Sequence, residues 1–240
     1  MTSAAALRLY WSPDSANLVI RQALERFELP FEGLRIDRGK LQHKAPDYLA
    51  KNPQGLLPVL EDGDLVLFET GAILLHLAER TGLAGPEGPE LADPKVRGAL
   101  QKWLFYLSNT PHADLRAAFY THRYVGDEAA IPVVWAGLAR RFRGHLDLLE
   151  AALPEKGGLL GPVTVLDTYL SCLIRWAQLY GGAAHRLSDL ETWPKLYHLM
   201  REIEAMPAIR RAFAAEYIQD TRPITRPERP VLPEQEITGE

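Results

Sequence analysis

Short apolar runs alternate with helical patterns over the first eighty residues. Four runs have the length of strands: 7–11, 31–36, 57–60 and 65–68. Three further segments carry apolar residues at helical spacing: 17–27, 46–51 and 69–80. The Asp62-Gly63 pair between the last two runs is typical of a hairpin turn. This order of elements predicts a small sheet, partly parallel and partly antiparallel, covered by helices.

The remainder of the chain has helical patterns only. Helices are expected over 94–109, 131–153 and 165–180, with shorter ones after Pro194 and after Pro207. An α/β domain over residues 1–82 is therefore followed by an all-α domain over 95–220. The Gly/Pro-rich segment 83–94 predicts a linker, and 221–240, with four prolines, predicts an extended tail.

Composition narrows the class of protein. The chain has 240 residues and a formal net charge of −4, which argues against nucleic acid as a partner. The single cysteine, Cys172, excludes an internal disulfide and indicates a reducing compartment. The first residues do not have the pattern of a signal peptide, and no apolar stretch has the length of a membrane span. A cytoplasmic protein without a membrane partner is expected.

The most specific motif lies in the first domain. Residues 43–73 read HKAPDYLAKNPQGLLPVLEDGDLVLFETGAI. This block resembles the Asn-Pro-x-Gly-x-x-Pro block of the cytosolic glutathione transferase superfamily, in the form seen in its phi class. The similarity covers about residues 7–215 and extends to zeta-like and beta-like members. It implies a thioredoxin-like first domain, a helical-bundle second domain and glutathione as cosubstrate, with no cofactor.

The resemblance assigns glutathione contacts to three pairs of residues: His43 and Lys44, Leu57 and Pro58, and Glu69 and Thr70. Pro58 matches a cis-proline that exposes the backbone of the preceding residue to the tripeptide. Glu69 and Thr70 stand at the expected start of a helix. Helix N–H groups and a hydroxyl can bind the α-carboxylate of the γ-glutamyl group of glutathione, and the acid can bind its ammonium group. The alternative interpretations are an ordinary proline turn for Pro58, a helix cap for Glu69 and Thr70, and a solvated surface pair for His43 and Lys44. Leu56 departs from the family, where a polar residue is common.

The segment LYWSPDSANL, residues 9–18, is where the resemblance places the group that activates the glutathione thiol. A hydroxyl that donates to sulfur favours the thiolate, which is the nucleophile. Counting back from Arg21 favours Ser15, with Ser12 second and Asn17 third. A role for Ser15 as a helix N-cap is the alternative. Ala16 stands where cysteine-using relatives carry their thiol.

Aromatic side chains are expected to form the pocket for the electrophile. The candidates are Trp11, Phe105, Tyr106, His112, Phe119 and Tyr120, and ordinary helix packing is the alternative for each. Thr164 and Asp167 have capping-box spacing before an apolar helix, where Cys172 is expected to be buried. The seven histidines show no paired spacing for a metal.

The sequence therefore favours a glutathione transferase that conjugates glutathione to small hydrophobic electrophiles, as in detoxification. The family implies a homodimer. Two other functions stay open. One is a different glutathione-dependent enzyme, an isomerase or a peroxidase. The other is a binding or regulatory module without catalysis on the same fold.

Overall fold

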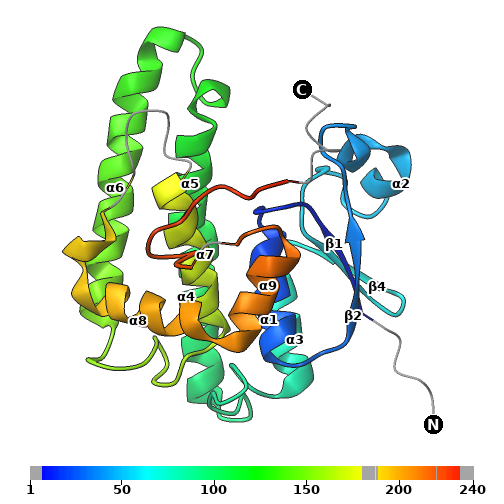
Figure 1. The fold of residues 1–240 in the computed structure, drawn as a ribbon, viewed down its shortest axis with the longest axis vertical. Coiled ribbons are helices and arrows are strands. Elements are labelled where there is room, and N and C mark those ends of the chain that lie inside the picture. The colour runs from blue at the N-terminus through cyan, green and yellow to red at the C-terminus, as the bar shows by residue number, and fades with distance from the viewer. Residues whose placement is uncertain (1–6, 180–186, 188, 220, 233–240) are drawn as a thin grey trace.

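A four-stranded mixed sheet forms the first domain in the computed structural model, which describes residues 7–179, 187, 189–219 and 221–232 (Figure 1). The strands are β1 (Leu7–Trp11), β2 (Phe31–Arg35), β3 (Val59–Asp62) and β4 (Leu65–Phe68). Their order across the sheet is β2-β1-β3-β4, with β1 parallel to β2 and the other pairs antiparallel. The predicted mixed sheet is confirmed.

Helices cover both faces of this sheet. Helices α1 (Asn17–Arg26) and α3 (Thr70–Thr81) lie on one face, against the alternating apolar side chains Leu7, Leu9 and Trp11. The short helix α2 (Pro46–Leu49) lies on the other, where the rings of Tyr48 and Tyr10 meet edge to face at 5.9 Å. A single 3-10 turn, Gln42–Lys44, precedes α2.

The second domain consists of helices that pack around one buried helix. They are α4 (Pro94–Asn109), α5 (Pro111–Phe119), α6 (Ile131–Ala152), α7 (Val165–Leu179), α8 (Pro194–Ala205) and α9 (Pro207–Ala215). Short 3-10 turns cover Thr121–Arg123, Glu128–Ala130 and Leu190–Thr192. All but the last residue of α7 is buried, because α7 lies between α1 of the first domain and the surrounding helices.

The predicted elements agree with the structure except at a few boundaries. Strand β3 begins at Val59 rather than at residue 57, because Pro58 has no N–H to give to the ladder. Helix α5 was not expected as an element of its own, and it begins at Pro111, which ends α4. The expected helix over 165–180 ends at Leu179, and residue 180 lies outside the described residues.

The linker and the tail are packed rather than free. Ala84 is fully buried, and its C=O accepts the N–H of Val165 at the start of α7. In the tail, Pro223, Ile224 and Thr225 are buried. Residues 221–232 therefore belong to the folded structure, and residues 233–240 lie outside the described part.

The capping box ahead of α7 is confirmed. Asp167 Oδ2 accepts the N–H and the hydroxyl of Thr164 at 2.7 and 2.8 Å, and Asp167 Oδ1 accepts the N–H of Leu159 at 2.9 Å. Cys172 is buried as expected, and burial raises the pKa of its thiol well above its usual range.

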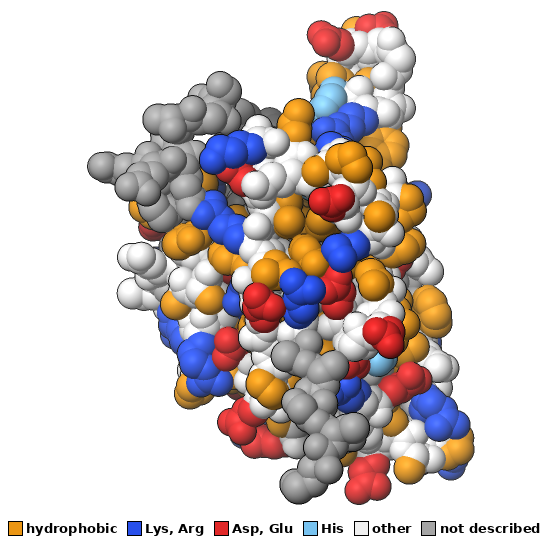
Figure 2. All heavy atoms as spheres, turned by 90° about the vertical axis from the view of Figure 1, so that its right-hand side faces the viewer, with side chains coloured by type: hydrophobic (Ala, Val, Ile, Leu, Met, Phe, Trp, Pro, Cys, Tyr) orange, Lys and Arg blue, Asp and Glu red, His pale blue; other side chains and the backbone are white. Residues whose placement is uncertain are grey.

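Charged side chains of both signs are mixed on the surface that Figure 2 shows, which is the right-hand side of Figure 1. Within the described ranges, no helix is both long and apolar enough to cross a membrane.

Candidate active site

The strand register brings three predicted segments to one edge of the sheet. Tyr10, Val59 and Phe68 pair side by side across β1, β3 and β4. Because these neighbours are antiparallel, the turn after β1, the Leu57-Pro58 bond before β3 and the Glu69-Thr70 pair after β4 all lie beyond that row. This shared edge faces the helical domain, where Ser108 of α4 lies beside Gly71.

The turn 12–17 after β1 is held by the side chain of Asn17. The Asn17 Oδ1 atom accepts the Ser12 N–H at 2.9 Å and also accepts the Ser15 hydroxyl in a short hydrogen bond. Its Nδ2 donates to Glu216 at 2.7 Å. The Ser12 hydroxyl makes no hydrogen bond with any described residue. Asn17 and Ser15 are thus engaged within the turn, whereas Ser12 keeps its donor.

The predicted alternative for Ser15 does not apply. The N-cap of α1 is Ala16, and no side chain caps this helix. The Ser15 C=O accepts the Leu18 N–H at 2.8 Å.

Asp14 links this turn to the helical domain, and it was not expected from the sequence. It is buried with a φ of +48°, and its carboxylate accepts Nε and Nη2 of Arg175, both at 3.0 Å. The indole N–H of Trp176 donates to the same carboxylate at 2.9 Å. A buried arginine in the apolar pattern of α7 is the sequence signal for this contact, since such a cation requires a partner.

The Leu57-Pro58 peptide bond is cis, as predicted. The neighbouring backbone is fixed, because the C=O of Leu56 accepts the Tyr48 hydroxyl at 2.7 Å and the Asn52 amide at 2.9 Å. The N–H and C=O of Leu57 make no hydrogen bond with another described residue. Both groups can therefore pair with an extended peptide, in the manner of a further strand.

Glu69 and Thr70 form the start of α3. Glu69 has a φ of +75°, a conformation that costs free energy for a residue with a side chain and occurs most often at functional sites. Its carboxylate accepts the Gln54 amide at 3.0 Å. The first helical hydrogen bond joins the Ile73 N–H to the Glu69 C=O, so the preceding N–H groups of α3 have no partner within the helix. They can bind a carboxylate.

His43 and Lys44 lie at the same end of the sheet. The Lys44 ammonium donates to the C=O of Gln54, the residue that also contacts Glu69, at 3.1 Å. His43 Nδ1 is buried without a hydrogen-bond partner in the described structure. Burial lowers the pKa of His43, and the charges of Arg38 and Lys44 lower it further. His43 therefore contributes a neutral imidazole.

His112 is the predicted pocket residue that the structure places beside the turn. Its Nδ1 lies 2.7 Å from the Tyr169 hydroxyl, and its ring is 5.7 Å from that of Trp176, which binds Asp14. Burial lowers the pKa of His112 to about 4. Burial raises the pKa of Tyr169, and the nearby charge of Glu69 contributes. His112 and Tyr169 are thus neutral partners in one hydrogen bond.

Of the other predicted pocket residues, Trp11 ends β1 directly before the turn, and Tyr106 lies on α4. Trp11 is buried, with the Arg21 guanidinium 4.6 Å from its ring and Tyr217 at 6.2 Å. Tyr106 points toward α6, where its hydroxyl lies 3.1 Å from His145 Nδ1.

The remaining three lie farther along α4 and α5. Phe105 is 58% exposed, and Phe119 and Tyr120 are half-buried near the end of α5. Tyr120 stacks on Arg123 at 4.5 Å. Next to His112 the structure places Tyr169 and Trp176, two buried aromatic side chains that were not expected there.

Histidine, cysteine, aspartate and glutamate side chains do not gather into groups of three or more suited to a metal within the part of the chain that the structure covers.

A thioredoxin-like domain with a cis-proline edge, joined to an all-helical domain, is the architecture of the glutathione transferases. A family model described as "Glutathione S-transferase, N-terminal domain" matches residues 5–79. Glutathione S-transferase 3 of Zea mays is 40% identical over 179 residues, which cover 74% of this chain and 71% of that protein. Glutathione S-transferase F10 of Arabidopsis thaliana is 36% identical over 169 residues, which cover 66% and 75%.

The solved structure of a glutathione S-transferase from Xylella fastidiosa has a TM-score of 0.74 and 26% identity, and the match covers 88% of this chain and 98% of that one. The chain belongs to the glutathione S-transferase family.

Proposed function

We propose that the protein conjugates the thiolate of glutathione to small hydrophobic electrophiles. One observation carries this proposal. A free backbone segment at Leu57, a helix start at Thr70 and a hydroxyl at Ser12 meet at one edge of the sheet, although they are far apart in the sequence. These groups match a cysteinyl peptide unit, a carboxylate and a sulfur.

Glutathione would bind along this edge in an extended form. The N–H and C=O of Leu57 pair with its cysteinyl unit. The α-carboxylate of its γ-glutamyl group meets the first N–H groups of α3 and the Thr70 hydroxyl, and Glu69 meets its ammonium group. Lys44 and His43 lie where the glycine carboxylate would end.

Ser12 is the favoured group for thiol activation, ahead of Ser15. The Ser15 hydroxyl gives its hydrogen to Asn17 Oδ1, so it has none for a sulfur. Asn17 Nδ2 is likewise engaged with Glu216. A hydroxyl that donates to the sulfur stabilises the thiolate, which attacks the electrophilic carbon. The C–S bond forms as the bond to the leaving group breaks, and for an aryl halide the halide ion departs to solvent. The thiol proton leaves to solvent.

The electrophile would lie against the half-buried His112. This side chain presents a neutral aromatic surface, because His112 stays uncharged at neutral pH. This favours apolar substrates over charged ones.

Three wider statements follow from the family and the surface. Exposed apolar side chains on β4 and α4, namely Leu65, Val66 and Phe105, support a homodimer that would cover them. The single, buried cysteine supports a cytoplasmic location. Conjugation of apolar electrophiles supports a role in detoxification.

Binding and turnover test the proposed function together. Glutathione affinity is measured by calorimetry, and turnover is measured with an aryl halide and with a peroxide. We expect conjugation of the aryl halide. A wild-type protein that does not bind glutathione would contradict the proposal, and turnover of the peroxide alone would favour the peroxidase.

Thr70→Val tests the binding mode. It removes a donor to the γ-glutamyl carboxylate, so the dissociation constant of glutathione should rise about fivefold, equivalent to about 1 kcal/mol. Thr81→Val, at the opposite end of α3, is the matched control and should leave the affinity unchanged. Equal affinities of the two variants would place the carboxylate elsewhere.

A further inference from the structure

Glu216, the residue after α9, contacts the turn that carries Ser12 although it lies far away in the sequence. Its Oε2 accepts the Asp14 N–H at 2.9 Å, across 202 residues. Its Oε1 accepts Asn17 Nδ2 at 2.7 Å and Arg21 Nε at 3.1 Å. The Glu216 side chain is fully buried. Three donors from the first domain therefore converge on one carboxylate of the second.

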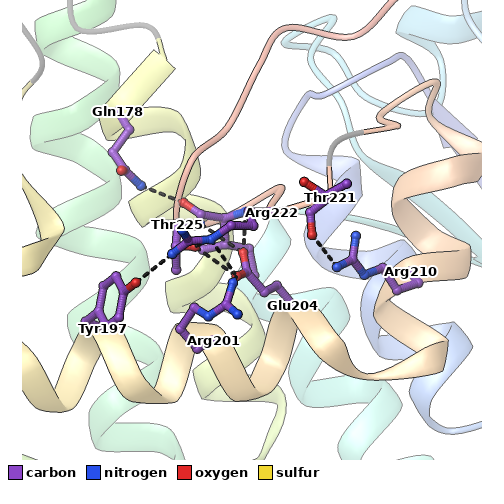
Figure 3. Close-up of polar contacts among 9 residues, drawn as sticks. Gln178, Tyr197, Arg201, Glu204, Arg210, Thr221, Arg222 and Thr225 are labelled. Carbon is purple, nitrogen blue, oxygen red and sulfur yellow. Dashed lines mark hydrogen bonds and ion pairs between the residues drawn. The ribbon is translucent and has the colours of Figure 1, made fainter.

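The segment after Glu216 is held by a second buried carboxylate, Glu204 of α8 (Figure 3). Glu204 accepts the N–H groups of Ile224 and Thr225 at 3.1 and 3.0 Å, and the Thr225 hydroxyl at 2.8 Å. Arg201 adds a contact at 2.7 Å from the same helix. Glu204 thus fixes the C-terminal segment without touching the turn.

Arg175 joins this segment to the same turn. Besides binding Asp14, it donates to the C=O of Pro223 at 2.5 Å and to the C=O of Glu228 at 2.8 Å. The Val231 N–H returns to the C=O of Tyr217 at 3.1 Å, and the Tyr217 ring lies against Trp11 at the end of β1. The C-terminal segment is therefore packed beside the turn on two sides.

The shape of the turn requires such support. Asp14 has a φ of +48°, and a residue with a side chain keeps that conformation only where its surroundings impose it. Asn17 is fully buried, so without Glu216 its amide group would lack an acceptor in a site closed to water. Rotation of Asn17 would then release the Ser12 N–H, whose acceptor is the same amide.

We propose that Glu216 is a positioning residue for thiol activation, which holds the turn 12–17 in the shape that directs the Ser12 hydroxyl at the glutathione sulfur. This inference rests on the proposed function and adds to it a part of the active site that comes from the end of the helical domain. Glu216 itself does not touch the substrate in this account. It acts through Asn17 and through the backbone of Asp14.

The experiment compares Glu216→Gln with the wild type in three measurements. The glutamine side chain fills the same volume but turns an N–H₂ group toward one of the three donors, so the turn loses a hydrogen bond. We expect faster amide hydrogen exchange at residues 12–17 without ligand. With glutathione bound, we expect the thiol pKa, read from thiolate absorbance, to rise by about one unit, and turnover below that pKa to fall about tenfold. The KM for glutathione should change less than about threefold.

Glu204→Gln is the matched control. It weakens an equally buried carboxylate that binds the C-terminal segment rather than the turn, so exchange should increase at residues 222–226. The thiol pKa and turnover should stay near their wild-type values. A stability loss common to both variants is thereby separated from an effect on the thiol.

Several results would overturn the inference. Exchange at residues 12–17 that is unchanged in Glu216→Gln contradicts the support of the turn. Faster exchange with an unchanged thiol pKa contradicts its link to activation, as does an equal pKa rise in Glu204→Gln. The exchange measurement needs no glutathione. A wild type that does not bind glutathione therefore removes the proposed function and the catalytic role of Glu216 together, while the structural contact is still judged separately.

Discussion

Ser12 and Ser15 lie in one short turn, yet their hydroxyl groups are in different situations. Ser15 donates to Asn17, whereas Ser12 has no partner among the described residues. The number of positions back from Arg21 favoured Ser15 in the sequence analysis. The acceptor to which a serine hydroxyl donates depends on which groups lie near it in the folded structure, and residue spacing does not show this.

Ser12→Ala should lower turnover at least about tenfold, because the thiolate loses its hydrogen-bond donor and the thiol pKa rises by about one unit. Glutathione affinity should change little. The measurement is the pH dependence of turnover with an aryl halide.

Ser15→Ala is the control for this change and should keep turnover within about threefold of the wild type, since only a bond inside the turn is lost. Loss of activity in Ser15→Ala with a fully active Ser12→Ala would reverse the assignment.

His112 should not titrate in the working range of the enzyme. Its pKa is lowered from 6.5 to about 4 by burial, so the imidazole stays neutral between about pH 5 and pH 8. His112→Gln should therefore alter the KM for the electrophile while the pH profile of kcat/KM keeps its shape. A step near pH 6.5 that disappears in the variant would show that His112 does carry charge.

Two local features of the motif 43–73 were predicted from the sequence, whereas the long-range contacts of the candidate site were not. The cis bond before Pro58 and the helix start at Thr70 follow from local chemistry. Arg175 and Glu216 had no local signal for their partners, because each contacts residues more than a hundred positions away.

At the scale of elements, the hydrophobic pattern predicted the strands and most helices well. Strand β1 and strand β4 match their expected bounds, because apolar runs that end at polar turns leave little freedom. Helix α5 was missed because the expected helix ended at residue 109 and the aromatic side chains that follow were interpreted as candidates for a pocket. Pro111 marks the boundary between α4 and α5, but a proline can either end a helix or begin one, so it did not by itself predict a second helix.

The capping box of α7 gives a prediction for stability. Asp167→Ala leaves three donors without an acceptor in a buried site, so the free energy of unfolding should fall by about 3 kcal/mol. Urea unfolding measures it.

Asp93→Ala provides the comparison for Asp167→Ala. Asp93 is the exposed N-cap of α4, and its carboxylate accepts only the Lys95 N–H, at 2.8 Å, so the loss of this side chain should cost about 1 kcal/mol or less. Equal losses in the two variants would show that burial of the cap is unimportant.

At the scale of the whole molecule, the two domains meet through buried ionisable groups as well as through apolar contact. Asp14 and Glu216 face Arg21 and Arg175, with the Cys172 thiol nearby. The order of an α/β domain followed by a helical one was predictable from the sequence pattern. The docking of residues 221–232 was not, because proline-rich, charged segments usually stay extended in solvent, and here Glu204 and Arg175 bind their backbone.

The pH dependence of stability follows from Glu216. Burial raises its pKa from 4.5 to about 8, although Arg21 opposes the shift. The folded state then binds a proton more readily than the unfolded state, so this group stabilises the fold below pH 4.5, and the contribution disappears as the pH rises through about 8. Glu216→Gln does not titrate at this position.

The free energy of unfolding of the wild type should therefore decline, relative to that of Glu216→Gln, as the pH rises from about 4.5 to about 8. Urea unfolding at a series of pH values measures this difference. A constant difference over the whole range would show that Glu216 is ionised throughout.

The contact between Glu216 and the turn also sets an order in time. The ribosome makes Glu216 about two hundred residues after Asp14 and Asn17, since the chain grows from its N-terminus. The nascent chain can complete the sheet and most helices while this turn still lacks its carboxylate. If the turn positions the thiol-activating hydroxyl as proposed, that competence follows the formation of the sheet rather than accompanying it.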